Sequence, residues 1–542
     1  MNGPRAELVV AGQVLVAAVP GRPERAEAIG IAGGRVVSAG TRAEVLDGAA
    51  RGHRLIEGGE AAVIPGLHDF HIHLVGLARS RMGVLLDDAR DGTEVIERLR
   101  AHAASTPPGS WVRGRGWSER QLATITTAEL DAAVAGRPAF ITSHDGHSAW
   151  ASAEARRLTG VAEVTEDPIG GRIERDDDGR PTGILRETAL DLVSSAVPEP
   201  QGEQLRPALE ATLRDLAGHG ITGASEAGDY TAEGGIGQDA ALGDSHSTLT
   251  DLGDVLDGRL RMTLGIPVDA IAAAAERGLR TGARLAGRRT MRFGWAKEYA
   301  DGALGSGTAA LFEPGGCGDG GTGILRVTPE SLDALFSAAR PAGIGLAIHA
   351  IGDRAAAVVL DAIGRAGAPA EGVPADRMEH LQLVRERDRA RLASLGVTAS
   401  IQPIHAAADR DLVETCWDGR QADAYAWRSL RAAGALLAAG SDAPVESVNP
   451  WLGVFAALHR RMPADPRGDW RPEEAMSAVE ALHAYTLGPA RAVGAVDEGH
   501  LRVGARADLA VLNVGLDALL GGEVDFEAVG SKTTIVDGVV ID

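Results

Sequence analysis

Two histidines separated by one residue are the first candidates for chemistry in this sequence. His71 and His73 lie in the segment HDFHIH, within an apolar run that predicts a β-strand. Side chains at positions i and i+2 of a strand point to the same face, so both imidazoles could reach one metal ion. Asp69 stands at even spacing from both and could share their face as a nearby carboxylate. The alternative is a pair of histidines on a half-buried strand with no bound metal.

Three further candidate ligands lie at or near the ends of later apolar runs. His349 lies in LAIHAIGD, His380 in RMEHLQ, and Asp442 in ALLAAGSDAPV. A single histidine near a strand is more often a core or surface residue, but two on consecutive strands favour a shared site. Asp442 could bind a metal ion and exchange a proton with a water on that ion. Its alternative role is to cap the turn that follows.

Lysine is almost absent from the chain. Of 54 basic residues only Lys297 and Lys532 are lysines. Arginine can make an ordinary ion pair, whereas carbon dioxide adds only to a primary amine that can lose its proton. Lys297, in WAKEYADG at the end of a predicted strand, could therefore form a carbamate whose two oxygens bridge two divalent metal ions. Chance retention or a plain ion pair is the alternative, and Lys532 has no assigned role.

A scaffold must bring these residues together. Eight short apolar runs between residues 61 and 444 alternate with stretches rich in Ala, Arg and Glu that have a helical pattern. This alternation predicts an α/β fold with a parallel sheet covered by helices, and eight units fit a (β/α)₈ TIM barrel. Active sites of such barrels lie at the C-terminal ends of the strands. The candidate ligands occur at those ends.

The ends of the chain differ from its middle. Residues 1–63 contain short β segments, including two predicted strands around Ala11 and Gly12, and residues 497–542 contain more of them. We expect one small β-sandwich domain formed from both termini, beside a barrel at residues 64–496. Residues 75–219, after the first barrel strand, are too many for a barrel connection and predict an inserted subdomain that covers part of the pocket.

Composition limits the classes of partner. The chain has 54 basic and 75 acidic residues, a net charge of −21, which argues against a nucleic-acid binder. It has no run of 18 or more apolar residues that would span a membrane. Cys317 and Cys416 are far apart and form no CxxC motif, which excludes a disulfide scaffold and suits a reducing cytoplasm. We expect a cytoplasmic protein with a small-molecule substrate, and homo-oligomerisation stays open.

Together the motifs resemble the amidohydrolase superfamily, in particular the family-three branch that includes N-substituted formamide deformylase-like enzymes. PGLHDFHIHL resembles its opening metal motif and KEYADGALGSGTAAL its lysine segment. LAIHAIGDRA, RMEHLQLV and GSDAPVESVNPW resemble the later ligand segments in the same order, and GARADLAVLN resembles the signature of the C-terminal β domain. WVRGRGW, GHSAW and PTGILRETAL are similar to parts of the insertion. The resemblance covers nearly the whole chain.

The resemblance implies a distorted (β/α)₈ barrel with a binuclear metal centre. The implied ligands are His71 and His73 for one ion, His349 and His380 for the other, Lys297 as a bridging carbamate, and Asp442 for the first ion. Zinc is the expected metal, and Mn, Fe or Co suit the same ligands. The family varies in metal count, so one ion with an unmodified lysine is the alternative.

The implied function is hydrolysis of a nonpeptide C–N bond, such as that of an N-acyl or N-formyl amide. A metal-activated hydroxide would attack the carbonyl, and Asp442 would pass a proton to the leaving amine. The alternatives are a deaminase or cyclic-amide hydrolase on the same scaffold, and a noncatalytic regulatory or binding protein. Release of ammonia would favour deamination, whereas the complete ligand set argues against a noncatalytic protein.

Three residues are candidate substrate contacts. His147, in GHSAW, could donate a hydrogen bond to a substrate oxygen or fix a loop. Trp117 could line an apolar pocket or belong to the core. Glu226 ends the second predicted barrel strand, where barrel active sites place functional groups.

Overall fold

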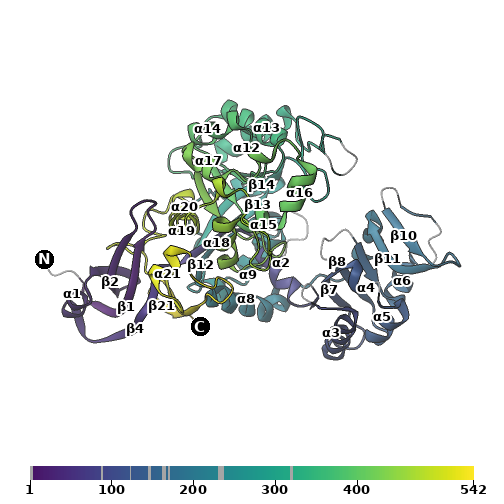
Figure 1. Cartoon of the computed structure of the whole chain (residues 1–542), viewed down its shortest axis with the longest axis horizontal. Coiled ribbons are helices and arrows are strands. Elements are labelled where there is room, and N and C mark those ends of the chain that lie inside the picture. The colour runs from purple at the N-terminus through teal and green to yellow at the C-terminus, as the bar shows by residue number, and fades with distance from the viewer. Residues whose placement is uncertain are drawn as a thin grey trace. The chain divides into compact units, whose positions relative to one another are not determined.

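The chain folds into two compact units. The computed structural model describes residues 4–86, 89–122, 124–143, 148–161, 166–168, 171–229, 237–315, 317 and 321–541. One unit contains Met1–Leu74 and Glu210–Asp542, and the other contains Val75–Leu209 (Figure 1).

Eight parallel strands form the centre of the first unit. In spatial order they are β5 (Leu67–Ile72), β12 (Ile221–Glu226), β13 (Arg261–Pro267), β14 (Met291–Tyr299), β15 (Leu346–Ala350), β16 (Arg377–His380), β17 (Thr398–Ile401) and β18 (Leu436–Ala439). Each strand pairs in parallel with the next. The sheet curls until β18 contacts β5, which nearly closes a barrel. The predicted barrel and all eight predicted strand segments are confirmed.

Helices connect and cover these strands. They are α8 (Arg206–Gly218), α9 (Asp244–Asp251), α10 (Gly253–Leu256), α11 (Ile271–Glu276), α12 (Pro329–Ala342), α13 (Asp353–Ala366), α14 (Glu386–Ser394), α15 (Pro403–Ala408), α16 (Arg410–Cys416), α17 (Trp427–Ala432), α18 (Pro450–His459), α19 (Ala478–Tyr485) and α20 (Leu487–Ala492). The bounds of α12 follow from local chemistry. Thr328 caps its first turn before Pro329, and Gly343 ends it at φ +67°.

Both termini contribute to one curled sheet of seven strands. Its order is β21 (Val539–Ile541), β20 (Ser531–Val536), β19 (Leu509–Leu512), β4 (Ala49–Pro65), β1 (Ala6–Ala17), β2 (Glu24–Ala32) and β3 (Arg35–Gly40). Two short helices, α1 (Arg42–Asp47) and α21 (Leu516–Gly521), accompany it. The purple N-terminal and yellow C-terminal strands are neighbours in Figure 1, because β4 pairs antiparallel with β19. The predicted β domain from both termini is confirmed.

The prediction of two strands around Ala11 and Gly12 is wrong. The segment forms the single strand β1, whose pairing with β2 shifts register between Ala11 and Val14. Glycine is required at position 12 because a Cβ there would lie 2.9 Å from the Ala61 carbonyl oxygen. The glycine therefore marks a bulge within a strand and not a turn between two strands.

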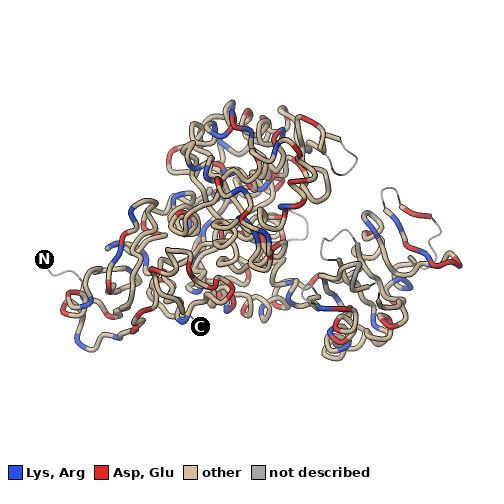
Figure 2. Tube along the Cα trace, viewed as in Figure 1, with Lys and Arg blue, Asp and Glu red and all other residues tan. Residues whose placement is uncertain are grey.

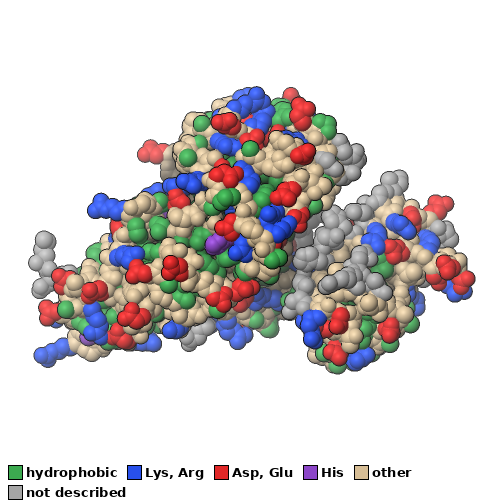
Figure 3. Space-filling model, in the orientation of Figure 1, with side chains coloured by type: hydrophobic (Ala, Val, Ile, Leu, Met, Phe, Trp, Pro, Cys, Tyr) green, Lys and Arg blue, Asp and Glu red, His purple; other side chains and the backbone are tan. Residues whose placement is uncertain are grey.

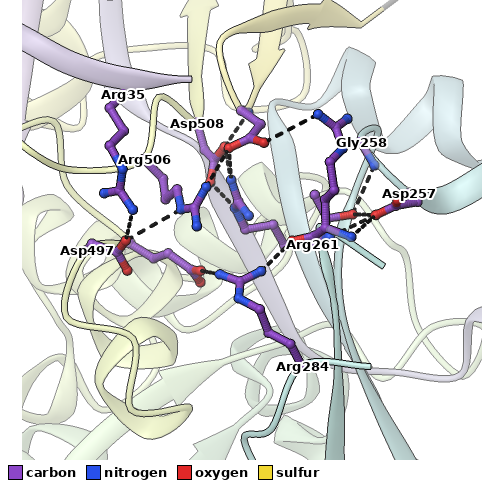
Figure 4. Close-up of polar contacts among 12 residues, drawn as sticks. Arg35, Asp257, Gly258, Arg261, Arg284, Asp497, Arg506 and Asp508 are labelled. Atoms are coloured by element: carbon purple, nitrogen blue, oxygen red, sulfur yellow. Dashed lines mark hydrogen bonds and ion pairs between the residues drawn. The ribbon is translucent and has the colours of Figure 1, made fainter. Parts of the chain in front are cut away.

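A buried arginine joins the barrel to the terminal sheet. Arg261, 4% exposed at the start of β13, donates from Nη2 to Asp508 over 3.0 Å (Figure 4). The same nitrogen donates to Asp537 over 3.0 Å. Arg506 donates to the same Asp537 oxygen over 3.0 Å. Because a buried charge is costly without partners, these ion pairs fix the terminal sheet against the N-terminal end of the barrel.

The second unit is built on a mixed sheet of six strands. Its order is β10 (Gly171–Arg175), β11 (Pro181–Glu187), β9 (Ser148–Ala151), β8 (Ala139–Ser143), β7 (Val112–Trp117) and β6 (Val84–Leu85). Its helices are α2 (Leu74–Ser80), α3 (Gly92–Ser105), α4 (Glu119–Leu122), α5 (Thr127–Ala133), α6 (Ala153–Thr159) and α7 (Asp191–Ser194). The unit has hydrophobic clusters of its own.

Charged residues are distributed along the whole chain (Figure 2). On the face drawn in Figure 3, acidic and basic side chains are interspersed and neither sign forms one large field. Among the residues that the structure describes, no helix is both long enough and apolar enough to cross a membrane.

Cys317 and Cys416 form a disulfide, contrary to the expectation from their spacing. Their Cα atoms lie 4.8 Å apart although 99 residues separate them in sequence. The bond joins the segment that follows β14 to the end of α16, and Arg420 donates to the Glu313 carbonyl oxygen in the same segment over 2.9 Å. Sequence distance was misleading because the barrel brings the segments after β14 and β17 together.

We expect loss of the disulfide to destabilise the barrel unit. A cross-link over about 100 residues restricts the unfolded chain, and such bonds typically contribute about 2–4 kcal/mol. The Cys416→Ser variant should therefore unfold at lower denaturant concentration than the oxidised wild type, measured by circular dichroism. Reductant should shift the wild type to the same midpoint and leave the variant unchanged. Equal midpoints for the oxidised wild type and the variant would contradict a stabilising role.

Candidate metal centre

The end of β5 and the loop after β18 place two histidines against one carboxylate. Nε2 of His71 lies 3.3 Å and Nε2 of His73 lies 3.4 Å from Oδ1 of Asp442. One ligand atom from each residue lies within 4.8 Å of the others. His71 is 1% exposed and Asp442 is 6% exposed. The strand alternation that singled out His71 and His73 brings both rings to the same side.

Backbone contacts fix this junction between the first and last barrel strands. The Asp442 amide donates to the His71 carbonyl oxygen over 2.7 Å, and the His73 amide donates to the Ala443 carbonyl oxygen over 2.9 Å. Gly440 permits the approach, because a Cβ there would lie 2.3 Å from the His71 nitrogen. Asp442 itself adopts φ +60°, a backbone conformation that is uncommon outside glycine.

Asp69 supports the junction. Its Oδ1 accepts from the Ser441 amide over 2.9 Å, and its Oδ2 accepts from the Ser441 hydroxyl over 2.5 Å. Burial raises the pKa of Asp69 to about 6, although these hydrogen bonds act to lower it. The carboxylate thus holds the loop after β18 next to β5.

A second carboxylate orients His71. Oε2 of Glu379, a residue of β16, lies 2.5 Å from Nδ1 of His71. The same oxygen accepts a hydrogen bond from Nη2 of Arg377 over 3.0 Å. Burial alone would raise the pKa of Glu379, but the Arg377 guanidinium and His71 hold it well below its usual range. His71 therefore donates from Nδ1, which leaves the Nε2 lone pair directed at the site, as in carboxylate–histidine–metal arrangements.

His349 and His380 form the other side of the centre. Their ring centroids lie 4.5 Å apart, and His380 lies 5.0 Å from the His71 ring. His349 Nε2 is 2.9 Å from the Gly302 carbonyl oxygen, to which it donates, so Nδ1 is left with its lone pair. His380 Nδ1 lies 3.9 Å from Asp442 Oδ2 and has no hydrogen-bond partner among the described residues. Burial lowers the pKa of His349 to about 3, which keeps its imidazole neutral.

The backbone at His380 departs from strand alternation. Arg377 and Glu379 share one face of β16, which would direct residue 380 to the opposite face. His380 instead adopts φ +73°, and its ring lies on the same side as that of His71. A left-handed conformation at a nonglycine residue costs about 1–3 kcal/mol and is concentrated at functional sites.

Lys297 is buried on β14, 1% exposed. Its Nζ lies 4.8 Å from the centroid of the Tyr299 ring. Burial lowers the pKa of Lys297 to about 8, although the carboxylates of Glu379 and Asp442 oppose that change. A substantial fraction of the amine is therefore neutral near pH 8, the form that reacts with carbon dioxide.

Asp442 is ionised and has its two oxygens directed to different groups. Burial alone would raise its pKa, but positive charge on the neighbouring imidazoles of His71 and His73 holds the pKa well below its usual range. A bound cation would supply that positive charge when the imidazoles direct their lone pairs at it. Oδ1 faces these two histidines, whereas Oδ2 lies 3.9 Å from His380 Nδ1 and 3.5 Å from His405 Nε2.

The three predicted substrate contacts lie in different surroundings. Glu226 is 3% exposed at the end of β12, accepts from the Leu74 amide over 2.7 Å, and has its pKa raised to about 7 by burial. Trp117 is 1% exposed in the core of the second unit and donates to the Ile141 carbonyl oxygen over 2.8 Å. His147 lies outside the described residues.

Three site residues were absent from the sequence predictions: Glu379, Asp301 and His405. Asp301 accepts from the Ile351 and Gly352 amides over 3.0 and 2.8 Å and so positions the loop after His349. Glu379 directly precedes His380, and a carboxylate adjacent to a candidate ligand is a usable signal. His405 closes the seventh apolar run, GVTASIQPIH, and the rule that polar residues at strand ends are functional would have found it.

The donor set fits a divalent ion. Imidazole nitrogens and a carboxylate are ligands that Zn, Mn, Fe and Co accept. The unpartnered Nδ1 of His380 and the close approach of the His71, His73 and Asp442 ligand atoms are explained by a bound cation.

The barrel and this cluster are those of a metal-dependent hydrolase. A family model described as "Amidohydrolase family" matches residues 56–542, and the chain belongs to this family. It is 29% identical over 492 residues to the putative amidohydrolase YtcJ of Bacillus subtilis, covering 89% of each chain. It is 30% identical over 514 residues to the N-substituted formamide deformylase of Arthrobacter pascens, covering 92% of each.

A solved structure agrees with these relatives. An uncharacterised metal-dependent hydrolase from Pyrococcus furiosus matches with a TM-score of 0.73 and 26% identity, over 92% of this chain and 97% of the other. The likeness extends over the barrel and the terminal sheet, since nearly all of both chains is covered.

We expect Glu379→Gln to weaken metal binding. The neutral glutamine side chain cannot balance the charge of Arg377 and does not fix which nitrogen of His71 carries hydrogen. Loss of such a partner typically lowers metal affinity about 10–100-fold. The affinity for Zn²⁺ can be measured by competition with a chromophoric chelator. Glu386→Gln, a change at an exposed position on α14, is the matched control and should bind as the wild type does. Equal affinities for all three proteins would refute the role of Glu379.

Proposed function

We propose that this protein hydrolyses the C–N bond of an N-acyl or N-formyl amide, giving a carboxylic acid and an amine. The observation that carries the proposal is the position of Asp442, with one oxygen 3.3 and 3.4 Å from two histidines and the other directed away from them. A carboxylate so placed can exchange a proton between water and a leaving group. The relative named as an N-substituted formamide deformylase supports this substrate class.

The proposed metal ligands are divided into two groups. His71, His73 and Asp442 would hold one divalent ion, His349 and His380 the other, and the carbamate of Lys297 would bridge them. Zinc is the first candidate, with Mn, Fe or Co as substitutes. Bound ions of this kind polarise a carbonyl and lower the pKa of water toward neutrality.

Asp442 would move one proton in the reaction. Water adds to the carbonyl carbon and gives its proton to Asp442, which is ionised and able to accept it. The C–N bond then breaks, and Asp442 passes the proton to the departing nitrogen. The balance is amide plus water to acid plus amine, with Asp442 returned to its starting state. We propose that the substrate is a small molecule and that neither nucleic acid nor a membrane takes part. The Cys317–Cys416 disulfide removes the argument for a reducing compartment that the cysteine spacing gave.

The proposal is tested by metal analysis of the purified protein together with a hydrolysis screen of N-acyl amines. We expect release of amine and acid from one class of amide. Release of ammonia from an amino-substituted ring would indicate deamination, and ring opening would indicate a cyclic-amide hydrolase. A protein that binds less than one metal ion per chain and turns over no substrate in metal-supplemented buffer would be a binding protein.

Asp442→Asn should abolish turnover. The amide keeps an oxygen donor but cannot carry the proton, so we expect kcat to fall about 10²–10⁴-fold. Metal content, measured by plasma mass spectrometry, should stay above one ion per chain, because the histidines remain. Full activity of the variant would remove the proton-transfer role.

Lys297→Arg should lower the metal content from two ions per chain toward one, because arginine cannot form the bridging carbamate. In the wild type, ¹³C-labelled bicarbonate should give a carbamate carbon signal by NMR, and the variant should lack it. Lys532→Arg is the matched control, as it changes the other lysine and should keep both ions and the signal. One ion and no carbamate signal in the wild type would indicate an unmodified lysine.

A further inference from the structure

A fifth imidazole faces the centre without belonging to the proposed ligand set. His405 lies in the first turn of α15, directly after β17, the strand that follows the one carrying His380. Its Nε2 lies 3.5 Å from Asp442 Oδ2, and its side chain is 12% exposed. Nε2 has no hydrogen-bond partner among the described residues. An almost buried ring nitrogen without a partner costs about 1–3 kcal/mol, which favours a partner from outside the chain.

The ring of His405 stands apart from the close cluster of ligand atoms. The group of atoms within 4.8 Å of one another contains His71, His73 and Asp442, and it includes neither His405 nor the proposed ligands His349 and His380, so the ring separations are what distinguish His405. The His405 and His380 ring centroids are 6.0 Å apart, against 4.5 Å between His380 and His349. His405 therefore borders the centre on the side of Asp442 Oδ2.

The local structure holds His405 in place. The Asp409 amide donates to the His405 carbonyl oxygen over 2.7 Å and closes the turn. Tyr425, which is 1% exposed, donates its hydroxyl to the Asp409 carboxylate. The Tyr425 ring packs at 5.7 Å from that of Trp427, which is fully buried. These contacts fix the end of α15 and the start of α16, and they involve no metal ion.

The two oxygens of Asp442 set the direction from which substrate must come. Oδ1 faces His71 and His73, so a proton carried by Asp442 has to leave from Oδ2. The departing nitrogen must therefore approach Oδ2, and the carbonyl carbon and oxygen lie within two bonds of that nitrogen. His405 Nε2 is on this side.

We propose that His405 is a catalytic residue whose Nε2–H donates a hydrogen bond to the carbonyl oxygen of the scissile amide as that carbon becomes tetrahedral. The inference rests on the proposed amide hydrolysis and adds a donor for the developing negative charge. In the balanced reaction His405 keeps its proton throughout. Water supplies the new C–O bond, and Asp442 carries the one proton that moves to nitrogen. Donors aimed at such an oxygen typically contribute about 10²–10³-fold to kcat.

The test compares wild type, His405→Asn and His405→Gln with N-hexylformamide as substrate and Zn²⁺ as the metal. We expect kcat to fall about 10²–10³-fold in His405→Asn while KM stays within about threefold, since the bond strengthens only in the transition state. His405→Gln, which offers a longer amide donor, should recover part of the loss. His459→Gln is the matched control, because His459 pairs with Asp469 outside the site and its loss should leave kcat unchanged.

A second measurement separates substrate contact from metal binding. Metal content and the visible absorption of the Co²⁺-loaded protein should be the same for wild type and both His405 variants. A changed Co²⁺ spectrum or a lower metal content would make His405 a ligand and overturn the inference. Unchanged kcat in both variants, or a rise in KM alone, would overturn it as well while the hydrolase proposal stands. A wild type that hydrolyses no N-acyl amine would refute both.

Discussion

The buried chain from Arg377 through Glu379 to His71 determines the geometry of the whole centre. Glu379 is held ionised in the barrel by one guanidinium, and its other contact fixes which nitrogen of His71 carries hydrogen. A rotated His71 would direct a donor instead of a lone pair toward Asp442. Arg377 in turn stacks at 4.0 Å over Phe70 and donates to the Phe70 carbonyl oxygen over 2.7 Å, which ties β16 to β5. The orientation of the first ligand is thus decided on the opposite side of the barrel.

Much of this architecture is predictable because it follows strand periodicity. The eight strands are short apolar runs, and His71, His73, His349 and Asp442 stand where those runs end. The parts that were missed depend on contacts between distant segments. Glu379 meets His71 across 308 residues, and the cysteines pair across 99. His380 was a predicted ligand, but the left-handed backbone through which it reaches the centre is encoded by no periodic pattern.

The site also completes the barrel. In the described strand order β5 and β18 are the two edges of the sheet, with no ladder between them. The bonds that join these edges belong to the centre itself, from Asp442 to His71 and from His73 to Ala443. Asp69 adds two bonds to Ser441 at the same place. Function and closure therefore depend on the same few residues, so substitutions there affect both.

The contacts between β5 and the loop after β18 can form only late in synthesis of the chain. Asp69 at β5 and Ser441 in the loop after β18 are 372 positions apart in sequence, so the two segments that meet here leave the ribosome far apart in time. At about 5–20 residues per second the interval is roughly 20–75 s. During that interval the growing chain holds His71 and His73 without Asp442, the carboxylate that lies against both of them. Acquisition of the full ligand set is thus a late event of biosynthesis, and a truncated chain that ends before residue 442 lacks both the closed barrel and its complete centre.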